Sequence, residues 1–114
     1  MMTGRKDDAE KVRFDLLPLG ALEEIAKVLS FGSRKYDDDN WRKVPNLRRR
    51  YFGAALRHVT AWRLGEITDP ETGLHHLAHA ACNLLFVLSE EIGHDPDFDQ
   101  AGQSEALRES RGSQ

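Results

Sequence analysis

Residues 65–83 read GEITDPETGLHHLAHAACN, a turn rich in carboxylates that runs into three of the chain's five histidines. Thr68 and Asp69 can each accept hydrogen bonds from the free N–H groups at the start of a helix, and Pro70 suits a first helical turn. Glu71 lies three residues after Thr68, which is the spacing of a capping box. The stretch therefore predicts a helix that begins at this turn.

The predicted helix has two contrasting faces. Apolar residues at three- and four-residue steps predict the face that packs on a core: Leu74, Leu77, Ala78, Ala81, Leu84, Leu85 and Leu88. Beside them, polar residues recur at every fourth position and predict one stripe: Glu71, His75, His79 and Asn83. Such a ladder can coordinate a cation, orient a water or hold a phosphate. For any single histidine a solvated or hydrogen-bonded face is the simpler explanation, but the nearby carboxylates favour a polar site.

The composition describes one small domain. The chain has 114 residues, of which 39% are hydrophobic. Its longest apolar run, residues 84–88, is too short to cross a bilayer, and the N-terminus lacks the apolar stretch of a signal peptide. The lone Cys82 cannot form an internal disulfide and is expected to be a small buried side chain. We therefore expect a cytoplasmic protein that does not bind a membrane.

Charge divides the chain into a neutral body and an acidic tail. Residues 1–92 hold 14 Lys+Arg and 14 Asp+Glu, whereas residues 93–114 hold two bases and five acids. Such a body is a poor scaffold for a nucleic-acid polymer. We expect residues 1–10 to be flexible, residues 11–92 to form a helical domain and residues 93–114 to be a disordered tail.

Two further helices are predicted before the histidine stretch. Helical apolar spacing predicts one over residues 18–31, ended by Gly32 and preceded by an extended segment, and one over residues 47–64, with Asn46 as its cap. In the first, Glu23 is expected to pair with Lys27, four residues on. The adjacent Glu23 and Glu24 can also supply a carboxylate to a metal.

The second predicted helix carries a histidine on its buried side. His58 and its neighbour Arg57 place a titratable ring where it must have a hydrogen-bonding partner. His58 is then either a satisfied core histidine or a part of the same polar pocket as the later histidines.

The connection between these two helices has the inventory of a nucleotide site. Lys35 can hold a phosphate, the rings of Tyr36 and Trp41 can stack on a base, and Asn40 can bond a base edge or a sugar hydroxyl. The alternative is a polar loop that Trp41 anchors to the core.

Several blocks in order resemble the phage dATP/dGTP diphosphohydrolase family. The blocks cover residues 11 to about 90, and they read Lys11-x-Arg13-Phe14-Asp15-Leu16-Leu17-Pro18, Ala21-Leu22-Glu23-Glu24, Phe31-Gly32-x-x-Lys35-Tyr36 with Asn40-Trp41, Ala55-Leu56-Arg57-His58, and Gly65-Glu66-x-x-Asp69-Pro70-Glu71-x-Gly73-Leu74-x-His76-Leu77-x-His79-Ala80-Ala81-Cys82-Asn83.

The resemblance implies an all-α, MazG-like nucleoside triphosphate pyrophosphohydrolase. Such an enzyme uses Mg2+, with Mn2+ as an alternative, to cleave a purine deoxynucleoside triphosphate to the monophosphate and pyrophosphate during phage growth. It also implies a site built across packed helices of an oligomer. The related group commonly carries Glu-x-x-Glu and Glu-x-x-Asp motifs, whereas this chain has Glu23-Glu24 and then His75, His79 and Asn83.

On this interpretation each group of candidate residues has a role. The expected metal ligands are carboxylates, because Mg2+ prefers oxygen: Glu23, Glu24, Glu66 and Asp69. The expected catalytic residues are Glu71, His79 and His75, as general base or phosphate donor. The expected substrate-binding residues are Lys35, Tyr36, Asn40, Trp41, Arg57, His58 and Asn83.

Three main helices of this size cannot close a full core alone, so we expect a homodimer or homotetramer that completes a helical bundle. Two rival functions remain open. One is a His-Asp-type metal phosphohydrolase, which would release nucleoside and triphosphate. The other is a non-catalytic helical module that binds a nucleotide or a protein.

Overall fold

Three α-helices of 17 residues each make up most of the described chain, which comprises residue 4 and residues 10–93 of a computed structural model. They are α1 (Leu19–Lys35), α2 (Leu47–Arg63) and α3 (His76–Ile92), with short 3-10 helices η1 (Phe14–Leu16) and η2 (Asn40–Lys43) before α1 and α2. Within these residues the only β-type pairing is an isolated bridge between Thr68 and His75. The prediction of an all-α fold is thus confirmed.

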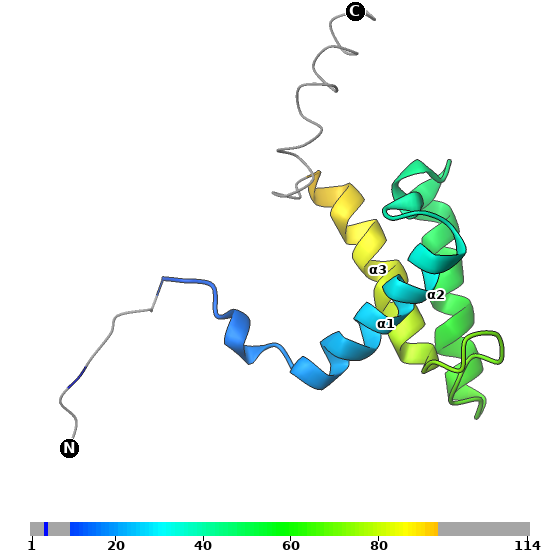
Figure 1. Cartoon of the computed structure of the whole chain (residues 1–114), viewed down its shortest axis with the longest axis horizontal. Helices are drawn as coiled ribbons and strands as arrows, with labels where there is room; N and C mark the ends of the chain where they lie inside the picture. Colours follow the sequence, from blue (N-terminus) through cyan, green and yellow to red (C-terminus); the bar gives the residue numbers. More distant parts are fainter. Residues whose placement is uncertain (1–3, 5–9, 94–114) are drawn as a thin grey trace, which may run out of the picture.

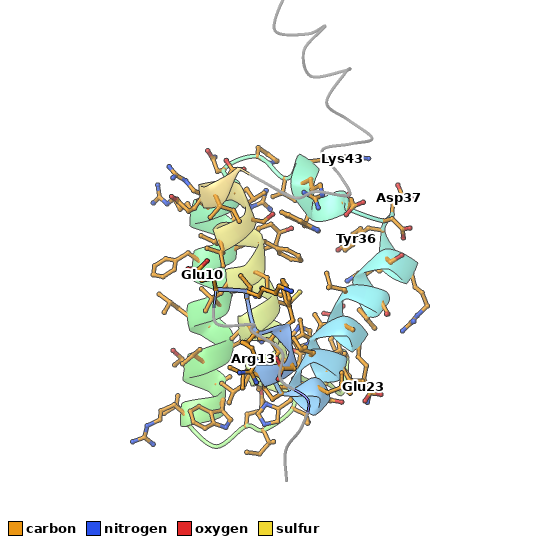
Figure 2. The ribbon with its side chains drawn as sticks, turned by 90° about the vertical axis from the view of Figure 1, so that its left-hand side faces the viewer. Glu10, Arg13, Glu23, Tyr36, Asp37 and Lys43 are labelled. Atoms are coloured by element: carbon orange, nitrogen blue, oxygen red, sulfur yellow. The ribbon has the colours of Figure 1, made fainter. Side chains whose placement is uncertain are left out.

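The helices α2 and α3 form an antiparallel hairpin, and α1 crosses α3 (Figure 1). Figure 2 shows α1 inclined to this hairpin. Tyr36 and Asp37 follow the carboxyl end of α1, and Lys43 of η2 lies at the same end of the molecule as they do. The segment containing η1 leads away from the helices (Figure 1). No helix among the described residues combines the length and apolar character that crossing a membrane requires.

Helix α1 is longer than its sequence predicts, because Gly32 does not end it. The helix continues to Lys35, and the Tyr36 N–H donates to the Gly32 carbonyl oxygen at 2.8 Å. Arg34 and Lys35 follow Gly32, and cations are favourable at the carboxyl end of a helix. Lys27 Nζ forms its ion pair with Glu24 Oε2, at 2.7 Å and three-residue spacing, rather than with the predicted partner Glu23, whose charge makes only the smallest contribution to the raised pKa of Lys27.

Helix α3 begins later than predicted, at His76, so the expected four-residue polar ladder does not form on a helix. Asp69 Oδ2 accepts hydrogen bonds from the Glu71 and Thr72 backbone N–H groups, each at 3.0 Å, but these close a turn rather than start a helix. Gly73 then adopts φ +72°, a left-handed conformation that ends the turn. Glu71 and His75 therefore lie in the loop between α2 and α3.

The cap of α3 is His75, whose Nδ1 accepts a hydrogen bond from the Leu77 N–H at 3.0 Å. The predicted end of this helix near Gly93 is confirmed, with Gly93 at φ +62°. Asn46 occupies the N-cap position of α2 as predicted, but its side chain makes no capping bond. The segment before α1 is not simply extended, because it contains η1. The predicted tail, residues 94–114, lies outside the described residues.

The core of the described chain is small and is made of small side chains. The buried apolar residues are Ala55, Ala78, Ala80 and Cys82, which let α2 and α3 approach closely. Burial raises the pKa of the Cys82 thiol to about 12, as expected for an inert core cysteine. Many large apolar side chains of α2 and α3 stay exposed, among them Phe52, Leu56, Leu84 and Leu88. One copy of the described chain therefore leaves much apolar surface in contact with water.

Two glycine substitutions test these helix boundaries. Gly32→Ala should raise the free energy of unfolding by about 0.5–1 kcal/mol, because Gly32 is helical and no atom lies within 4 Å of an added Cβ. Gly73→Ala should lower it by about 1–2 kcal/mol, because φ +72° is strained for an L-residue. Urea unfolding followed by circular dichroism measures both. A destabilising Gly32→Ala would show that α1 ends there.

Candidate functional site

A buried imidazole joins α2, α3 and the start of their connecting loop. His76 is only 3% exposed, its Nε2 lies 2.6 Å from Glu66 Oε1, and its Nδ1 lies 2.8 Å from His58 Nδ1. Because the Glu66 carboxylate is an acceptor, it takes the Nε2–H of His76, and in the tautomer that carries its proton there the His76 Nδ1 accepts from His58. A buried polar ring is thus satisfied on both sides.

The loop adds a second set of hydrogen bonds beside this pair. Thr72 Oγ1 lies 2.7 Å from His79 Nε2 and 3.3 Å from Asp69 Oδ2, and it accepts the Leu74 N–H at 3.1 Å. The rings of His79 and His58 stack, with centroids 4.6 Å apart and planes 10° apart. We call His58, Glu66, Asp69, Thr72, His76 and His79 the histidine cluster.

Two imidazoles of the cluster, His58 and His79, have a lowered pKa, and so has the Asp69 carboxyl beside them. Burial lowers the pKa of His58, and the neighbouring His79 and His76 lower it further. Burial also lowers the pKa of His79, although the Asp69 carboxylate opposes this effect. For Asp69, partial burial raises the pKa, but the hydrogen bonds from Thr72 and Glu71 and the proximity of His79 outweigh it and leave the pKa below its ordinary value. Neutral imidazoles can accept a proton or bind a cation.

A cavity of about 420 Å³ lies between the end of α1, the η2 segment, α2 and α3, and its lining begins on α3 at Cys82, three residues after His79 of the cluster. Its lining includes four of the predicted substrate-binding residues: Tyr36, Asn40, Trp41 and Asn83. Trp41 stacks on Phe86 with centroids 4.4 Å apart, and the Arg42 guanidinium lies 4.3 Å from its ring centroid. Trp41 is therefore a fixed wall of the cavity, as the anchoring alternative proposed. The volume falls in the range of small-molecule sites.

Lys35 lies between the cavity and the loop of the cluster. Its Nζ bonds Glu71 Oε1 at 2.7 Å and lies 5.4 Å from the ring centroid of Tyr36, which lines the cavity. The Glu71 carboxylate raises the pKa of Lys35, so this side chain is a cation. Both side chains of the pair are about half exposed, which makes the pair easy to open.

The structure brings together most, but not all, of the residues predicted for the site. Glu66, Asp69, His58 and His79 meet in the histidine cluster. By contrast, Glu24 pairs with Lys27 on α1, Glu23 is exposed there, and exposed Arg57 has its guanidinium beside Gly53. His75 caps α3.

Sequence reasoning did not assign a role to His76 or Thr72, although both are central to the cluster. His76 lies three residues before His79, so the two rings share one side of α3, and this spacing could have indicated it. Thr72 carried no such signal, since its position depends on the turn at Gly73.

Comparison with known proteins identifies the family. A sequence model described as dATP/dGTP diphosphohydrolase, N-terminal, matches residues 1–101. The chain belongs to this family. A protein of Salmonella phage PMBT28 named dATP/dGTP diphosphohydrolase is 38% identical over 115 residues, which cover 98% of this chain. The predicted family resemblance is thereby confirmed.

The family relationship extends over only part of that relative. The aligned region is 39% of the length of the phage protein, so this chain spans about two-fifths of it. No solved structure matches the chain. The function of the region that this chain shares with the phage protein is therefore inferred mainly from the geometry of the cavity and the histidine cluster.

Proposed function

We propose that the chain hydrolyses purine deoxynucleoside triphosphates, dGTP or dATP, to the monophosphate and pyrophosphate. The proposed setting is the nucleotide pool of a phage-infected cell, in the host cytoplasm. One observation carries the proposal: a nucleotide-sized cavity and a cluster of imidazoles lie one turn apart on α3, with Lys35 between them. The relative from phage PMBT28, named dATP/dGTP diphosphohydrolase, supports the same substrate class.

In this proposal the purine occupies the cavity and the phosphates extend toward the cluster. Asn83 is 9% exposed, and its amide can bond a base edge while Tyr36 offers an aromatic ring. His79 precedes Asn83 by four residues, which is about 6 Å along the axis of a helix. Lys35 leaves Glu71 and binds the triphosphate, because an exposed ion pair contributes little free energy and the triphosphate carries more negative charge than the Glu71 carboxylate.

The reaction needs a water aimed at the α-phosphorus and a group that accepts its proton. The new P–O bond forms as the α–β bridging P–O bond breaks, and pyrophosphate leaves with the bond's electron pair. His79 is the proposed proton acceptor, because burial lowers its pKa and so favours the neutral ring, and because Thr72 orients that ring. Glu71 is proposed to hold Lys35 until substrate arrives. In this proposal His75 caps α3 and does not contact the substrate.

We propose that Mg2+ enters the site bound to the phosphates of the substrate. It binds proteins through one or two carboxylates together with substrate phosphates, and it prefers oxygen donors. The group of ligands that the described residues bring together is instead rich in nitrogen: His58, Asp69 and His76. These residues do not fit Mg2+. Glu23 and Glu24 stay predicted ligands that no contact in the described chain links to the cluster.

The His-Asp-type phosphohydrolase is the second candidate, and the nitrogen-rich ligand group is the observation that favours it. Its reaction breaks a different bond and releases nucleoside with triphosphate. Product identity therefore separates the two candidates without reference to the metal. The non-catalytic alternative leaves the substrate unchanged.

The proposed reaction predicts a defined product pattern. Incubation of the chain with each dNTP and divalent metal, followed by anion-exchange separation, should yield monophosphate and pyrophosphate in equal amounts from dGTP or dATP. His79→Ala should lower kcat by about 10²-fold, the usual size of a general-base effect. The matched control is Glu90→Gln on the exposed surface of α3, which should keep full activity. Triphosphate among the products, or an unaffected His79→Ala, would overturn this mechanism.

We also propose that two or four copies of the chain associate. Its support is the exposure of large apolar side chains on adjacent helices, for example Phe52 at 52%, Leu56 at 50% and Leu84 at 47%. A stable protein interface buries roughly 1,600 Å² and removes such side chains from water.

Light scattering coupled to size exclusion tests this association. The chain should elute with a mass that is two or four times 12.9 kDa. Replacing Phe52 and Leu56 together by Glu should shift it toward the monomer, whereas Arg49→Glu on the exposed start of α2 should leave the mass unchanged. A monomeric mass for the unmodified chain at micromolar concentration would contradict the proposal.

A further inference from the structure

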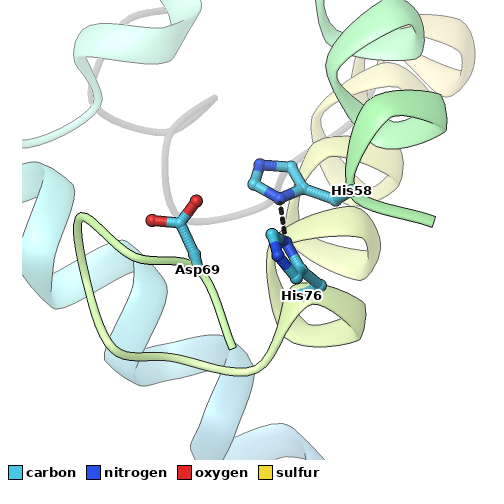
Figure 3. A group of neighbouring side chains, drawn as sticks. All are labelled: His58, Asp69 and His76. Carbon is cyan, nitrogen blue, oxygen red and sulfur yellow. Dashed lines mark hydrogen bonds between the residues drawn. The ribbon is translucent and has the colours of Figure 1, made fainter. Parts of the chain in front are cut away.

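Three potential metal ligands from three different segments converge inside the histidine cluster. Figure 3 shows His58 from α2, His76 from α3 and Asp69 from the connecting loop as neighbours, with the two imidazoles joined by a hydrogen bond. One ligand atom from each residue lies within 4.8 Å of the other two. His76 is buried, and the other two side chains are partly buried, so the group is partly shielded from solvent.

Glu66 prepares His76 as a ligand. A metal-bound histidine usually donates its other ring N–H to a carboxylate, which fixes the tautomer and makes the ring more basic. Glu66 Oε1 occupies that position, 2.6 Å from His76 Nε2, and therefore directs the Nδ1 lone pair of His76 toward His58. No reaction step in the proposed function requires this contact.

The positions of the ligand atoms need little adjustment to accept an ion. The two Nδ1 atoms are 2.8 Å apart. Metal–nitrogen bonds of about 2.0–2.1 Å would place them roughly 2.9–3.4 Å apart for bond angles between 90° and tetrahedral. The proton on His58 Nδ1 moves to Nε2 when the ion binds. At Asp69 the loop's hydrogen bonds converge on Oδ2, so ligation through Oδ1 disrupts none of them.

We propose that His58, Asp69 and His76 form a resident site for a divalent transition-metal ion such as Zn2+, Mn2+, Fe2+ or Co2+, in preference to Mg2+. Imidazole suits these borderline ions, whereas Mg2+ takes oxygen. Two imidazoles and one carboxylate leave coordination positions open for water or a phosphate oxygen. His79 lies outside this group of three ligand residues, and its Nε2 bonds Thr72 Oγ1 instead.

Metal affinity of the tag-free, chelator-treated chain tests the site directly. Isothermal titration should show one equivalent of Zn2+ or Co2+ per chain, bound at least ten times more tightly than Mg2+. The Co2+ complex should show visible d–d absorption of nitrogen and oxygen ligation. Glu66→Gln should weaken binding by about 10- to 100-fold, as expected for a residue that orients a ligand. His58→Gln should weaken it at least as much.

A matched variant separates this site from histidine binding in general. His75→Asn removes the adjacent imidazole while keeping a side chain that can cap α3, so Zn2+ affinity should be unchanged. Circular dichroism of each variant confirms that it is folded. Zn2+ affinity that equals Mg2+ affinity, or that survives both Glu66→Gln and His58→Gln in folded protein, overturns the inference.

The outcome is independent of the proposed reaction. A chain that binds Zn2+ at this site but leaves every dNTP intact contradicts the proposed function alone. A chain that releases pyrophosphate without any such binding contradicts the metal site alone.

Discussion

The burial of His76 is the constraint on which the rest of this structure depends. A buried imidazole without partners costs about 1–3 kcal/mol, so Glu66 and His58 must both reach it. The bond from Glu66 to His76 fixes the direction of the loop that follows α2. The bond between His58 and His76 fixes which residues of α2 and α3 lie opposite one another. The small residues Ala55, Ala78 and Cys82 permit the close approach that these bonds require. Packing and polar contacts thus specify one arrangement of the hairpin.

Helix α3 contributes to both the histidine cluster and the cavity, with different turns. Its first turns carry His76 and His79, which belong to the polar cluster, and the following turns carry Asn83 and Phe86, which line the cavity. Helix α1 closes the cavity with its last turn and presents Lys35 to the loop. The arrangement suits a ligand with an aromatic end and a charged end. A deoxynucleoside triphosphate has such an aromatic end and such a charged end, which is why we propose it as the substrate.

The sequence predicted the helices well and the polar contacts less well. Apolar spacing located all three helices, and Gly93 marked the end of α3. The prediction failed at Gly32 and at Asp69, because a glycine or a capping residue signals a boundary only when the backbone adopts the matching conformation. Asp69 closes a turn since Gly73, four residues on, takes a left-handed φ. His76 went unassigned because its role depends on Glu66 and His58, which only the folded hairpin brings to it.

The most direct test of this account is nitrogen NMR of the imidazole rings in metal-free, ¹⁵N-labelled protein. The account predicts that His76 is protonated at Nε2, that His58 is protonated at Nδ1, and that a ¹⁵N–¹⁵N coupling connects the two Nδ1 atoms across their hydrogen bond. Two rings that each average over both tautomers, with no coupling between them, would contradict it.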